Sequence, residues 1–417
     1  VGGAPRDMAM GLEPIDYDIA TDASPDEVSG LFERTYPVGR EFGVSIVMIG
    51  GNSFEVSQFR TEGEYIDGRR PSEVKSADET EDVKRRDFTI NALLYDPLQD
   101  KITDLVSGLD DIKAGIIKTI GDPGKRFSED LLRMLRAVRF SARFNFRIEH
   151  DTFEAIKHNA LKINNISPER IGEELSKIFT GNNPAQALTL LDETGLLEAV
   201  LPEVHSLKGV DQPKKYHPEG DVFAHTRLML EQFGVGSVTL AFGILLHDIA
   251  KPVTSTKTDR IRFNLHDTKG KEIAGTIMRR LRFANDIVSQ VQSLVSNHMR
   301  FINVPHMKQS TLRRFIALEG FDELLELFRL DCLASHGNLE IYDFLKNEIG
   351  RELKENNSLR LPELLVSGKD LISIGYKPGR IFNKILKTVQ DAQLEGDLTS
   401  KKGAVEFIRK EYPLNSH

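Results

Sequence analysis

The spacing of hydrophobic residues changes about a quarter of the way along this 417-residue chain. Up to residue 105, short runs rich in β-branched residues alternate with turn signals, and three runs are predicted strands: Val44–Ile49, Ser53–Phe59 and Thr89–Tyr95. From about residue 125, apolar residues recur at near-helical spacing, as in Leu131, Leu132, Leu135, Val138 and Phe140. The pattern predicts an α+β head followed by a long all-α body.

Capping and turn residues divide the helical part. Ser167-Pro168 predicts an N-cap with proline in the first helical position, and Asn182-Asn183-Pro184 predicts a loop and the start of another helix. Nearly everything after residue 184 is predicted to be helical, with breaks at Lys208–Glu219 and Thr254–Asp267. The length is enough for two or three domains, each with its own core.

Composition narrows the function classes. The net charge of −8 argues against indiscriminate binding of polyanions, but basic residues gather at 125–147 and 377–410. These two stretches fit either specific RNA contacts or solvated helix faces. No apolar stretch reaches about 18 residues, so no membrane-spanning helix is predicted. Cys332 is the only cysteine, which excludes an intramolecular disulfide and fits a cytoplasmic location.

Asp16-Tyr17-Asp18 places two acids at alternate positions of a run with strand character. Side chains at i and i+2 of a strand share a face, so both carboxylates project together. Hard oxygen ligands select Mg²⁺, and two such ions can clamp the attacking and leaving oxygens of an in-line displacement. Two solvated acids on an exposed strand are the alternative. Glu55 is a candidate third acid or the partner of an arginine.

Glycines before these acids and arginines after them suit a phosphate ligand. Gly2-Gly3 precedes the helical-looking run Arg6–Gly11, so backbone NH groups can cradle a triphosphate. Arg85-Arg86 can contact phosphates bidentately, and Asp87 is expected to organise them by hydrogen bonding. Asn91 is polar among apolar neighbours and requires a specific partner. A basic surface corner is the alternative interpretation.

Glu129-Asp130 and Arg133 lie in a predicted helix, where positions i and i+3 share a face. One interpretation is a local ion pair. The other is a protein template for a base, in which Asp130 accepts from the exocyclic amine of cytosine or adenine and Arg133 donates to a ring nitrogen or carbonyl. Uracil and guanine present a carbonyl to the carboxylate, and each unmatched buried polar group costs roughly 1–3 kcal/mol.

These motifs occur in one order and together resemble the class II tRNA nucleotidyltransferase and bacterial poly(A) polymerase family, most closely over residues 1–205. The motifs are Gly2-Gly3-x-x-Arg6-Asp7, Asp16-x-Asp18, Arg85-Arg86-Asp87-Phe88-Thr89-Ile90-Asn91-Ala92, Glu129-Asp130-x-x-Arg133 and Ser167-Pro168-Glu169-Arg170-Ile171. Two departures are Pro5, where an aliphatic residue or cysteine is usual, and the absence of strand residues before Gly2, which suggests truncation.

The resemblance implies a head, neck, body and tail, with a polymerase-β-like nucleotidyltransferase head built on a small mixed sheet. It implies that Asp16 and Asp18 are catalytic and hold Mg²⁺, and that a flexible loop spans Thr61–Val83 and includes Asp67-Gly68-Arg69-Arg70-Pro71. The residues expected to bind nucleotide are Gly2, Gly3, Arg6, Arg85, Arg86, Asp87, Asn91, Asp130, Arg133, Arg136 and Arg139.

A second series of histidines and acids follows. His247-Asp248 comes directly after the apolar helix predicted at Leu240–Leu246, and imidazole with carboxylate suits a transition metal such as Mn²⁺, Ni²⁺, Co²⁺, Fe²⁺ or Zn²⁺. The series resembles the HD phosphohydrolase superfamily over residues 217–340. Together with the first resemblance, it implies four domains, over residues 1–120, 121–205, 206–340 and 341–417. The resemblance implies phosphatase, 2′-nucleotidase or 2′,3′-cyclic phosphodiesterase chemistry, with a degenerate scaffold as the alternative. The implied ligands are His225, His247, Asp248 and Asp331, with His266 and His298 for a second metal.

The favoured function is addition of CMP and AMP to the tRNA 3′ end, with CTP, ATP and tRNA as partners and HD-domain repair of RNA ends as a second activity. Lys377 and Arg380 are expected to contact tRNA from the tail. The alternatives are a CC-adding, A-adding or poly(A)-adding relative, or a metal-dependent phosphohydrolase with an RNA-binding head. Both a monomer and a homodimer fit.

Overall fold

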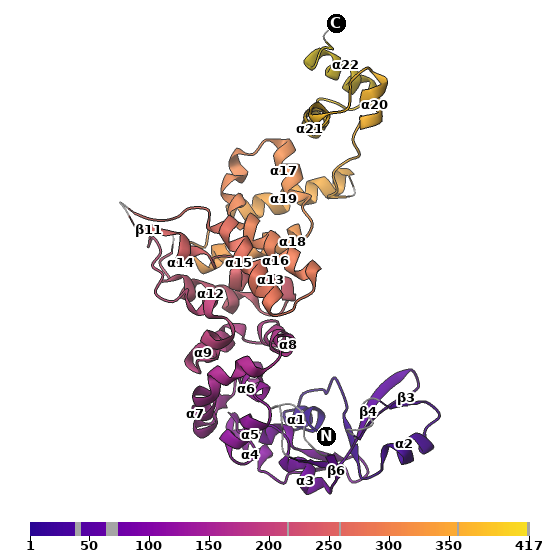
Figure 1. Cartoon of the computed structure of the whole chain (residues 1–417), viewed down its shortest axis with the longest axis vertical. Helices are drawn as coiled ribbons and strands as arrows, with labels where there is room; N and C mark the ends of the chain where they lie inside the picture. The colour runs from indigo at the N-terminus through magenta and orange to yellow at the C-terminus, as the bar shows by residue number, and fades with distance from the viewer. Residues whose placement is uncertain (38–42, 64–73, 215–216, 258–259, 357, 415–417) are drawn as a thin grey trace.

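The computed structural model describes residues 1–37, 43–63, 74–214, 217–257, 260–356 and 358–414. Figure 1 shows an elongated molecule, with the N-terminal head at one end, the C-terminal tail at the other and stacked helices between them. The predicted α+β head and all-α remainder are confirmed. Among the described helices, none is long and apolar enough to cross a membrane.

A small mixed sheet forms the outer part of the head. Its order is β1-β4-β3-β2, with β1 parallel to β4 and the other neighbours antiparallel. Ser24 caps the helix beside the sheet with a reciprocal capping box. The elements of this part are α1 (Gly3–Ala9), β1 (Ile19–Thr21), α2 (Pro25–Leu31), β2 (Thr35–Pro37), β3 (Val44–Ile49), β4 (Asn52–Gln58), β5 (Arg60–Glu62) and β6 (Val74–Ser76).

The loop expected over Thr61–Val83 is described only at its flanks, where β5 pairs with β6; residues 64–73, with Asp67-Gly68-Arg69-Arg70-Pro71, lie outside the described residues. The rest of the head consists of α3 (Glu79–Lys84), the 3₁₀ turn η2 (Thr89–Asn91), β7 (Leu94–Asp96), β8 (Lys101–Thr103), α4 (Gly108–Ala114) and β9 (Ile116–Ile117).

Two local predictions for the head are wrong. Thr89–Tyr95 is not one strand, because its first half is the turn η2. Its β-branched residues are buried instead against α4, where the Thr89 hydroxyl donates to Asp111 at 2.6 Å and the Thr89 carbonyl lies against Gly108. Asp16 and Asp18 also precede β1 and are not part of it.

The neck and body follow as packed helices. Ser167 and Pro168 occupy the predicted N-cap and first position of α8, and α9 starts at Pro184 as expected. The elements are α5 (Pro123–Glu129), α6 (Leu132–Phe144), β10 (Arg147–Ile148), α7 (His150–Asn159), η3 (Ala160–Asn165), α8 (Pro168–Phe179), α9 (Pro184–Glu193), α10 (Leu196–Val200) and α11 (Pro202–His205).

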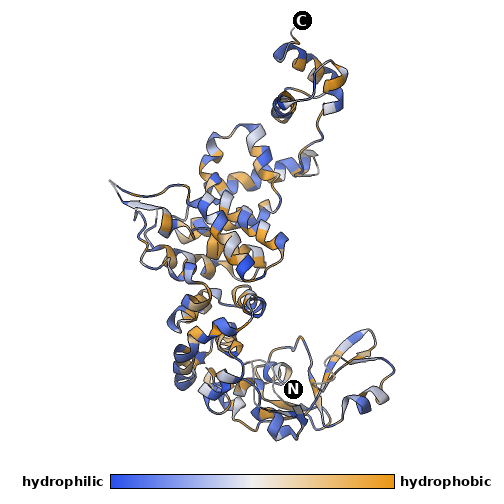
Figure 2. Ribbon diagram, viewed as in Figure 1, coloured by the Kyte–Doolittle hydropathy of each residue, from blue (hydrophilic) through white to orange (hydrophobic). Residues whose placement is uncertain are grey.

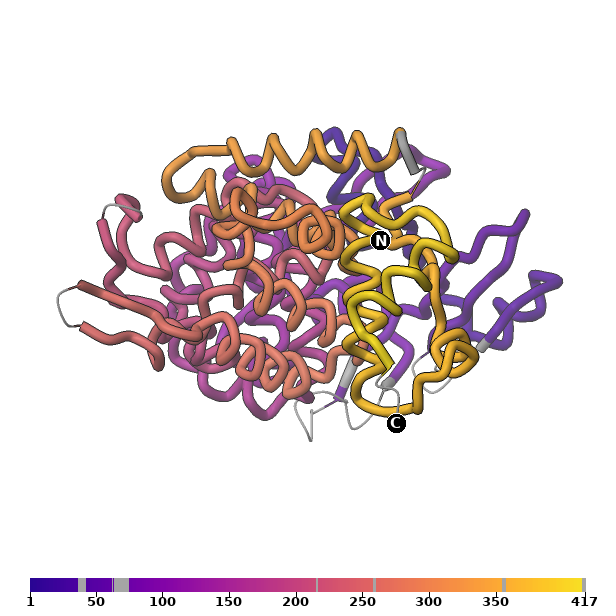
Figure 3. The backbone as a smooth tube through the Cα atoms, turned by 90° about the horizontal axis from the view of Figure 1, so that it is seen from above, coloured from indigo at the N-terminus to yellow at the C-terminus, as the bar shows by residue number. Residues whose placement is uncertain are grey.

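A second helical group carries the histidine series, and the two predicted breaks are present: a loop before α12 and the β11–β12 hairpin, which projects from the molecule in Figures 1 and 3. The elements are α12 (Val222–Phe233), α13 (Val238–Leu246), α14 (Lys251–Thr254), β11 (Ser255–Lys257), β12 (Ile261–Phe263), α15 (His266–Arg280), α16 (Asn285–Asn297), η4 (His298–His306), α17 (Gln309–Ile316), α18 (Phe321–Ala334) and α19 (Glu340–Asn356).

One hydrophobic core runs from Phe88 in the head through the neck to Leu345 in α19, without interruption near residue 205. Figure 2 shows apolar segments gathered where α13, α16 and α18 lie together. The tail has a separate core around Ile385, Val389 and Ile408, and is formed by α20 (Gly368–Ser373), α21 (Arg380–Glu395) and α22 (Lys401–Glu411).

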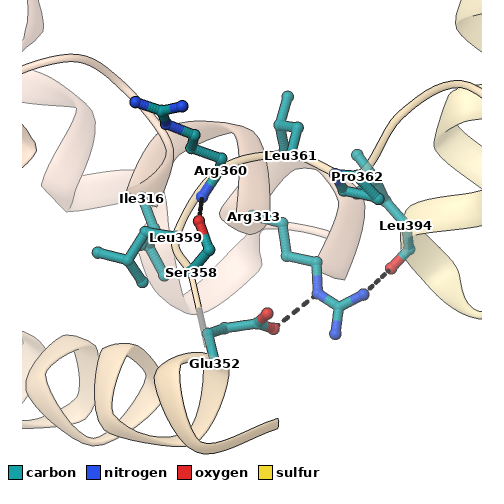
Figure 4. Close-up of a pocket in the computed structure, with 9 residues that line it drawn as sticks. All are labelled: Arg313, Ile316, Glu352, Ser358, Leu359, Arg360, Leu361, Pro362 and Leu394. Carbon is teal, nitrogen blue, oxygen red and sulfur yellow. Dashed lines mark hydrogen bonds and ion pairs between the residues drawn. The ribbon is translucent and has the colours of Figure 1, made fainter. Parts of the chain in front are cut away.

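Polar contacts join the tail to α17, which is itself hydrogen-bonded to α19. Arg313 donates to Glu352 at 2.7 Å and to the Leu394 carbonyl at 3.0 Å, beside a cavity of about 340 Å³ (Figure 4). Arg314 hydrogen-bonds Asp391 and also donates to Gln390 at 2.8 Å. The junction therefore depends on charged and polar groups more than on shared apolar surface.

Candidate functional sites

A cavity of about 650 Å³ opens between the head and the neck. Both expected catalytic acids and every residue expected to bind nucleotide line it. Sequence reasoning did not assign four further lining residues, although Arg143 belongs to the basic stretch 125–147 and Arg170 to the Ser167-Pro168 motif. The lining is Gly2, Gly3, Arg6, Asp16, Asp18, Arg85, Arg86, Asp87, Asn91, Asp130, Leu132, Arg133, Arg136, Arg139, Phe140, Arg143 and Arg170.

The acidic side of the cavity is crowded with carboxylates. Asp16 and Asp18 are exposed, and partial burial together with the charges of Asp18 and Asp16 raises the pKa of Glu55. Mutual repulsion among three acids is relieved by a divalent cation, so this donor set fits one. Gly2 has a φ of 73°, and a Cβ there would lie 3.2 Å from Arg86 Nη1 and 3.8 Å from Asp18 Oδ2. Glycine therefore allows the backbone to approach both groups.

The double arginine is held by an acid that sequence reasoning missed. Asp82, buried in α3, lies 2.7 Å from Arg85 Nη2 and 3.0 Å from Arg86 Nη2. Burial raises the pKa of Asp82, but the two guanidinium groups outweigh burial and the net pKa is lowered. The signal was present in the sequence, since Asp82 stands three and four residues before the two arginines in a helical turn.

Asn91 has the specific partners expected of a buried amide. Its carbonyl oxygen accepts from Arg6 Nη1 at 2.6 Å, and its nitrogen donates to Asp87 Oδ1 at 3.1 Å. The other Asp87 oxygen accepts from Arg136 Nε at 2.7 Å. A chain of hydrogen bonds thus joins α1, η2 and α6.

Asp130 and Arg133 both line the cavity, but the prediction that they share one helix is wrong. Asp130 lies between α5, which ends at Glu129, and α6, which starts at Leu132, and its backbone is extended, with φ −147°. Arg170 donates to Asp130 Oδ2 at 2.8 Å. Arg133 donates to Glu129 at 2.6 Å and, from Nη2, to the Arg85 carbonyl at 3.1 Å. Arg170 therefore orients the Asp130 carboxylate, and Glu129 with the Arg85 carbonyl orients the Arg133 guanidinium.

The histidine series converges in the second helical group. His225 comes from α12, His247 and Asp248 follow α13, His266 starts α15, His298 follows α16 and Asp331 belongs to α18. The Nε2 atoms of His225 and His247 lie 3.1 Å from Asp331 and Asp248 carboxylate oxygens respectively. His266 Nε2 lies 3.2 Å from His298 Nε2, and these two atoms lie 3.5 and 3.8 Å from Asp248 Oδ1.

The opposite ring nitrogens are fixed by hydrogen bonds, so all four Nε2 atoms face the shared centre. The Nδ1 atoms of His247, His266 and His298 lie 2.9, 2.7 and 2.7 Å from the carbonyls of residues 244, 263 and 295, and His225 Nδ1 lies 2.7 Å from Glu219. Such partners set the tautomer in which Nε2 binds metal. The buried Nε2 atoms of His225 and His247 lie close to carboxylate oxygens, but neither makes a hydrogen bond of acceptable geometry among the described residues. Such an arrangement fits ligands that share a metal ion.

Burial and neighbouring charges shift the pKa values of two histidines of this site in opposite directions. Burial lowers the pKa of His225, but the Asp331 and Glu219 carboxylates outweigh it and raise the pKa to about 9. Burial and the charge of His247 lower the pKa of His298 to about 4. Sequence reasoning missed Glu219 and Lys251. The Lys251 ammonium lies 2.6 Å from Asp248 Oδ2 and 2.6 Å from Gln212 Oε1.

Lys377 and Arg380 are exposed in the tail, at the start of α21 and at the opposite end of the molecule from the head (Figure 1). They are not brought together with either candidate site.

Comparison with known proteins gives three family models and full-length relatives. The models describe a poly A polymerase head domain at residues 1–118, a probable RNA and SrmB-binding site of polymerase A at 145–208 and an HD domain at 220–322. The CCA-adding enzyme of Ligilactobacillus salivarius is 34% identical over 412 residues, covering 96% of this chain and 89% of the relative. That of Bacillus licheniformis is 33% identical over 408 residues, covering 97% and 92%.

Solved structures agree. The crystal structure of the Bacillus stearothermophilus CCA-adding enzyme in complex with CTP matches with a TM-score of 0.74 at 26% identity, over 99% of this chain and 93% of that one. The Thermotoga maritima CCA-adding enzyme complexed with tRNA matches with a TM-score of 0.60 at 18% identity, over 99% and 90%, which shows likeness of fold.

Proposed function

This chain belongs to the family of CCA-adding enzymes, and from that premise we propose that it adds CMP and AMP to the 3′ end of tRNA without a nucleic acid template. The observation that carries the proposal is the single cavity that gathers the Asp16 and Asp18 carboxylates, a set of arginines and the Asp130–Arg133 pair. The resemblance drawn from the motifs is confirmed by the head and HD family models and by the relatives.

In the proposed reaction, the terminal 3′-hydroxyl oxygen forms a bond to the α-phosphorus of CTP or ATP. The bond to the β-phosphate breaks, pyrophosphate leaves and the hydroxyl proton passes to solvent. Family membership implies use of a divalent metal, and Mg²⁺ would neutralise charge on the phosphates and lower the pKa of the hydroxyl. Asp16 and Asp18 would hold it, while Arg85 and Arg86, fixed by Asp82, would bind phosphate oxygens.

Loss of a metal-holding carboxylate tests this assignment. Asp16→Ala should abolish nucleotide addition. CTP binding, measured by calorimetry, should persist, because the arginines and the Asp130–Arg133 pair remain. Asp110→Ala, which removes an exposed acid of α4 with only a 4.0 Å ion pair, is the matched control and should leave addition unchanged. If Asp16→Ala still added nucleotides, Asp16 would not be a ligand of the catalytic metal.

Asp130 and Arg133 are proposed to select the base. The carboxylate accepts from the N4 amine of cytosine or the N6 amine of adenine, and UTP and GTP offer a carbonyl instead. Asp130→Ala should therefore reduce the CTP:UTP ratio of kcat/KM by about tenfold or more, as expected for roughly 1–3 kcal/mol per unmatched group. Unchanged discrimination against UTP would refute the template.

We further propose that the HD domain hydrolyses phosphate groups on damaged RNA 3′ ends. The carrying observation is the convergence of four imidazole Nε2 atoms with two aspartates. His225, His247 and Asp248 form one ligand group, and Asp331 lies 3.1 Å from His225 Nε2. These four residues would hold one Mn²⁺, Ni²⁺, Co²⁺, Fe²⁺ or Zn²⁺ ion, and Asp248, His266 and His298 form a second ligand group. Such an ion would supply a hydroxide nucleophile at neutral pH.

Metal analysis and end-group chemistry test the second activity. Metal-free protein should bind a metal of this set in a calorimetric titration. The protein loaded with that metal should convert RNA ends that carry a 2′,3′-cyclic phosphate. His247→Ala should lose both properties and retain CCA addition, whereas Asp16→Ala should retain both. If the wild-type protein binds none of the five metals, the HD domain is a scaffold.

The remaining expectations are also proposals. The domain divisions stay at 1–120, 121–205, 206–340 and 341–417, and Lys377 and Arg380 are proposed to contact tRNA phosphates. The cytoplasm, where tRNA matures in bacteria, is the proposed location.

A further inference from the structure

A second cavity of about 480 Å³ adjoins the nucleotide cavity, because Arg139 and Arg143 line both. It lies between the C-terminal half of α6 and the last turn of α8 with the residues that follow it. Its lining is Arg139, Arg143, Lys177, Ile178, Thr180, Gly181 and Asn182. Three of these side chains are cationic and none is acidic, so the lining favours an anion over a cation.

The arginines of α6 have fewer or longer contacts to acids the farther they lie along the helix from Asp130. Arg136 makes two contacts to Asp87 Oδ2, at 2.7 and 2.6 Å. Arg139 makes one contact to Glu174, at 3.1 Å. Arg143 is 42% exposed and lies 3.8 Å from Asp7, and Lys177 is exposed without an ion-pair partner in the described part of the chain. Among these four cations, Arg143 and Lys177 are therefore the least neutralised, and both line the second cavity.

Aromatic rings hold the two shared arginines in place. The Arg139 guanidinium lies 4.7 Å from the centre of the Phe140 ring, and that of Arg143 lies 5.0 Å from the centre of the Phe144 ring. Both α6 and α8 end here, and helix C-termini carry partial negative charge. An anion in this cavity must accordingly be held by the side-chain cations, with no help from helix ends.

We propose that the second cavity binds the backbone phosphates of the RNA strand immediately upstream of its 3′-terminal nucleotide. This inference rests on the proposed nucleotidyl transfer, which requires the 3′-hydroxyl beside the α-phosphate in the first cavity. The strand that leads to that hydroxyl must leave the first cavity, and the shared Arg139–Arg143 wall gives it a cationic route. A polyphosphate of the incoming nucleotide is the competing occupant.

Lys177→Glu tests the route, because Lys177 lines the second cavity and not the first. The KM for tRNA should rise about tenfold, and the slope of log affinity against log salt should become shallower by about 1 or more, as expected when a phosphate contact is lost. The kcat and the KM for CTP should not change. Lys113→Glu, an exposed lysine of α4, is the matched control, and Lys177→Met repeats the test without charge reversal.

Neutral methylphosphonates placed singly at the last few linkages of the tRNA identify the phosphates involved. At one or two linkages the substitution should weaken binding to the wild-type protein and have no further effect on Lys177→Glu, since both changes remove the same contact. The proposal is overturned if the penalties are equal in the two proteins, if Lys177→Glu behaves like the control, or if it raises the KM for CTP instead. Direct RNA binding gives this answer even if no nucleotide is added, so failure of the route and failure of the proposed transfer are distinguishable.

Discussion

At the scale of single residues, Asp87 connects the head to the neck through one buried carboxylate. It accepts from its neighbour's backbone NH, from the Asn91 amide and from Arg136. Burial by itself raises the pKa of Asp87, but Arg136 and Asn91 outweigh burial and the net pKa lies below its usual value. The charged form is therefore the form that the fold stabilises.

Asp87→Asn should lower the free energy of unfolding by about 2–3 kcal/mol at pH 7, because Arg136 loses its buried partner while remaining partly exposed. Since the folded pKa is depressed, the stabilisation is complete above about pH 5 and is lost as pH falls through the folded pKa. Denaturant unfolding of both proteins between pH 7 and pH 3 should show the difference shrinking below about pH 4. A difference that does not depend on pH would contradict this account.

How much of a site the sequence predicts depends on sequence distance. The need of Asn91 for a partner follows from its apolar neighbours, and Asp82 could have been found from its helical spacing to Arg85 and Arg86. Arg170 reaches Asp130 across 40 positions, and no local pattern indicates that contact. Glu219 lies in a loop, where no helical periodicity relates it to His225, so its hydrogen bond to His225 could not be predicted either.

At the scale of elements, close backbone approach sets the packing of α8. Gly172 lies on its buried face, and a Cβ there would stand 2.6 Å from the Leu281 carbonyl oxygen and 3.5 Å from the Phe283 ring. The same helix carries Glu174, which pairs with Arg139, and Arg170, which pairs with Asp130. The Gly172 contact therefore positions Arg170, which lines the candidate cavity, and Glu174, which pairs with a lining arginine, relative to the second helical group.

Gly172→Ala should destabilise the protein by about 1–3 kcal/mol, since a backbone oxygen must move to admit the methyl group. Gly350→Ala is the control: it also lies within a helix, α19, but its Cβ would meet nothing within 4 Å, so better helix propensity should make it neutral or stabilising. Thermal unfolding of both variants measures the contrast. Equal melting temperatures would show that α8 can shift freely.

Helix starts were predicted where local chemistry decides them, as at Ser167-Pro168 and Pro184. The strand predicted at Thr89–Tyr95 failed because burial against α4 outweighs the β-propensity of its residues. The helix predicted through Asp130 failed for a related reason: the extended residue lets Asp130 meet Arg170, a contact that helical periodicity does not encode.

At the scale of the whole molecule, the core shared from Phe88 to Leu345 ties the two candidate active sites to one helical body, whereas the tail has its own small core and a polar junction. The two family resemblances place a domain boundary at residue 205, and apolar packing continues across that position. Sequence patterns mark changes of period, and they carry no information on whether neighbouring helices share a core.

The tail should therefore unfold in a separate transition at lower temperature than the body. Ile385→Ala, in the tail core, should shift that transition alone, and Ile277→Ala, equally buried in α15, should shift the main transition, each by about 2–5 kcal/mol. Differential scanning calorimetry resolves the two. A single transition moved by both substitutions would mean that the polar junction couples tail and body.

The central claim is that one cavity completes CCA on tRNA. The most direct measurement supplies tRNA ending at the discriminator base, at C or at CC with CTP, ATP or both, and determines product lengths to single-nucleotide resolution. The account predicts that all three substrates are completed to CCA and that addition then stops. Arrest at CC, extension only from CC, or an unlimited ladder of A would contradict it and identify a CC-adding, A-adding or poly(A)-adding relative.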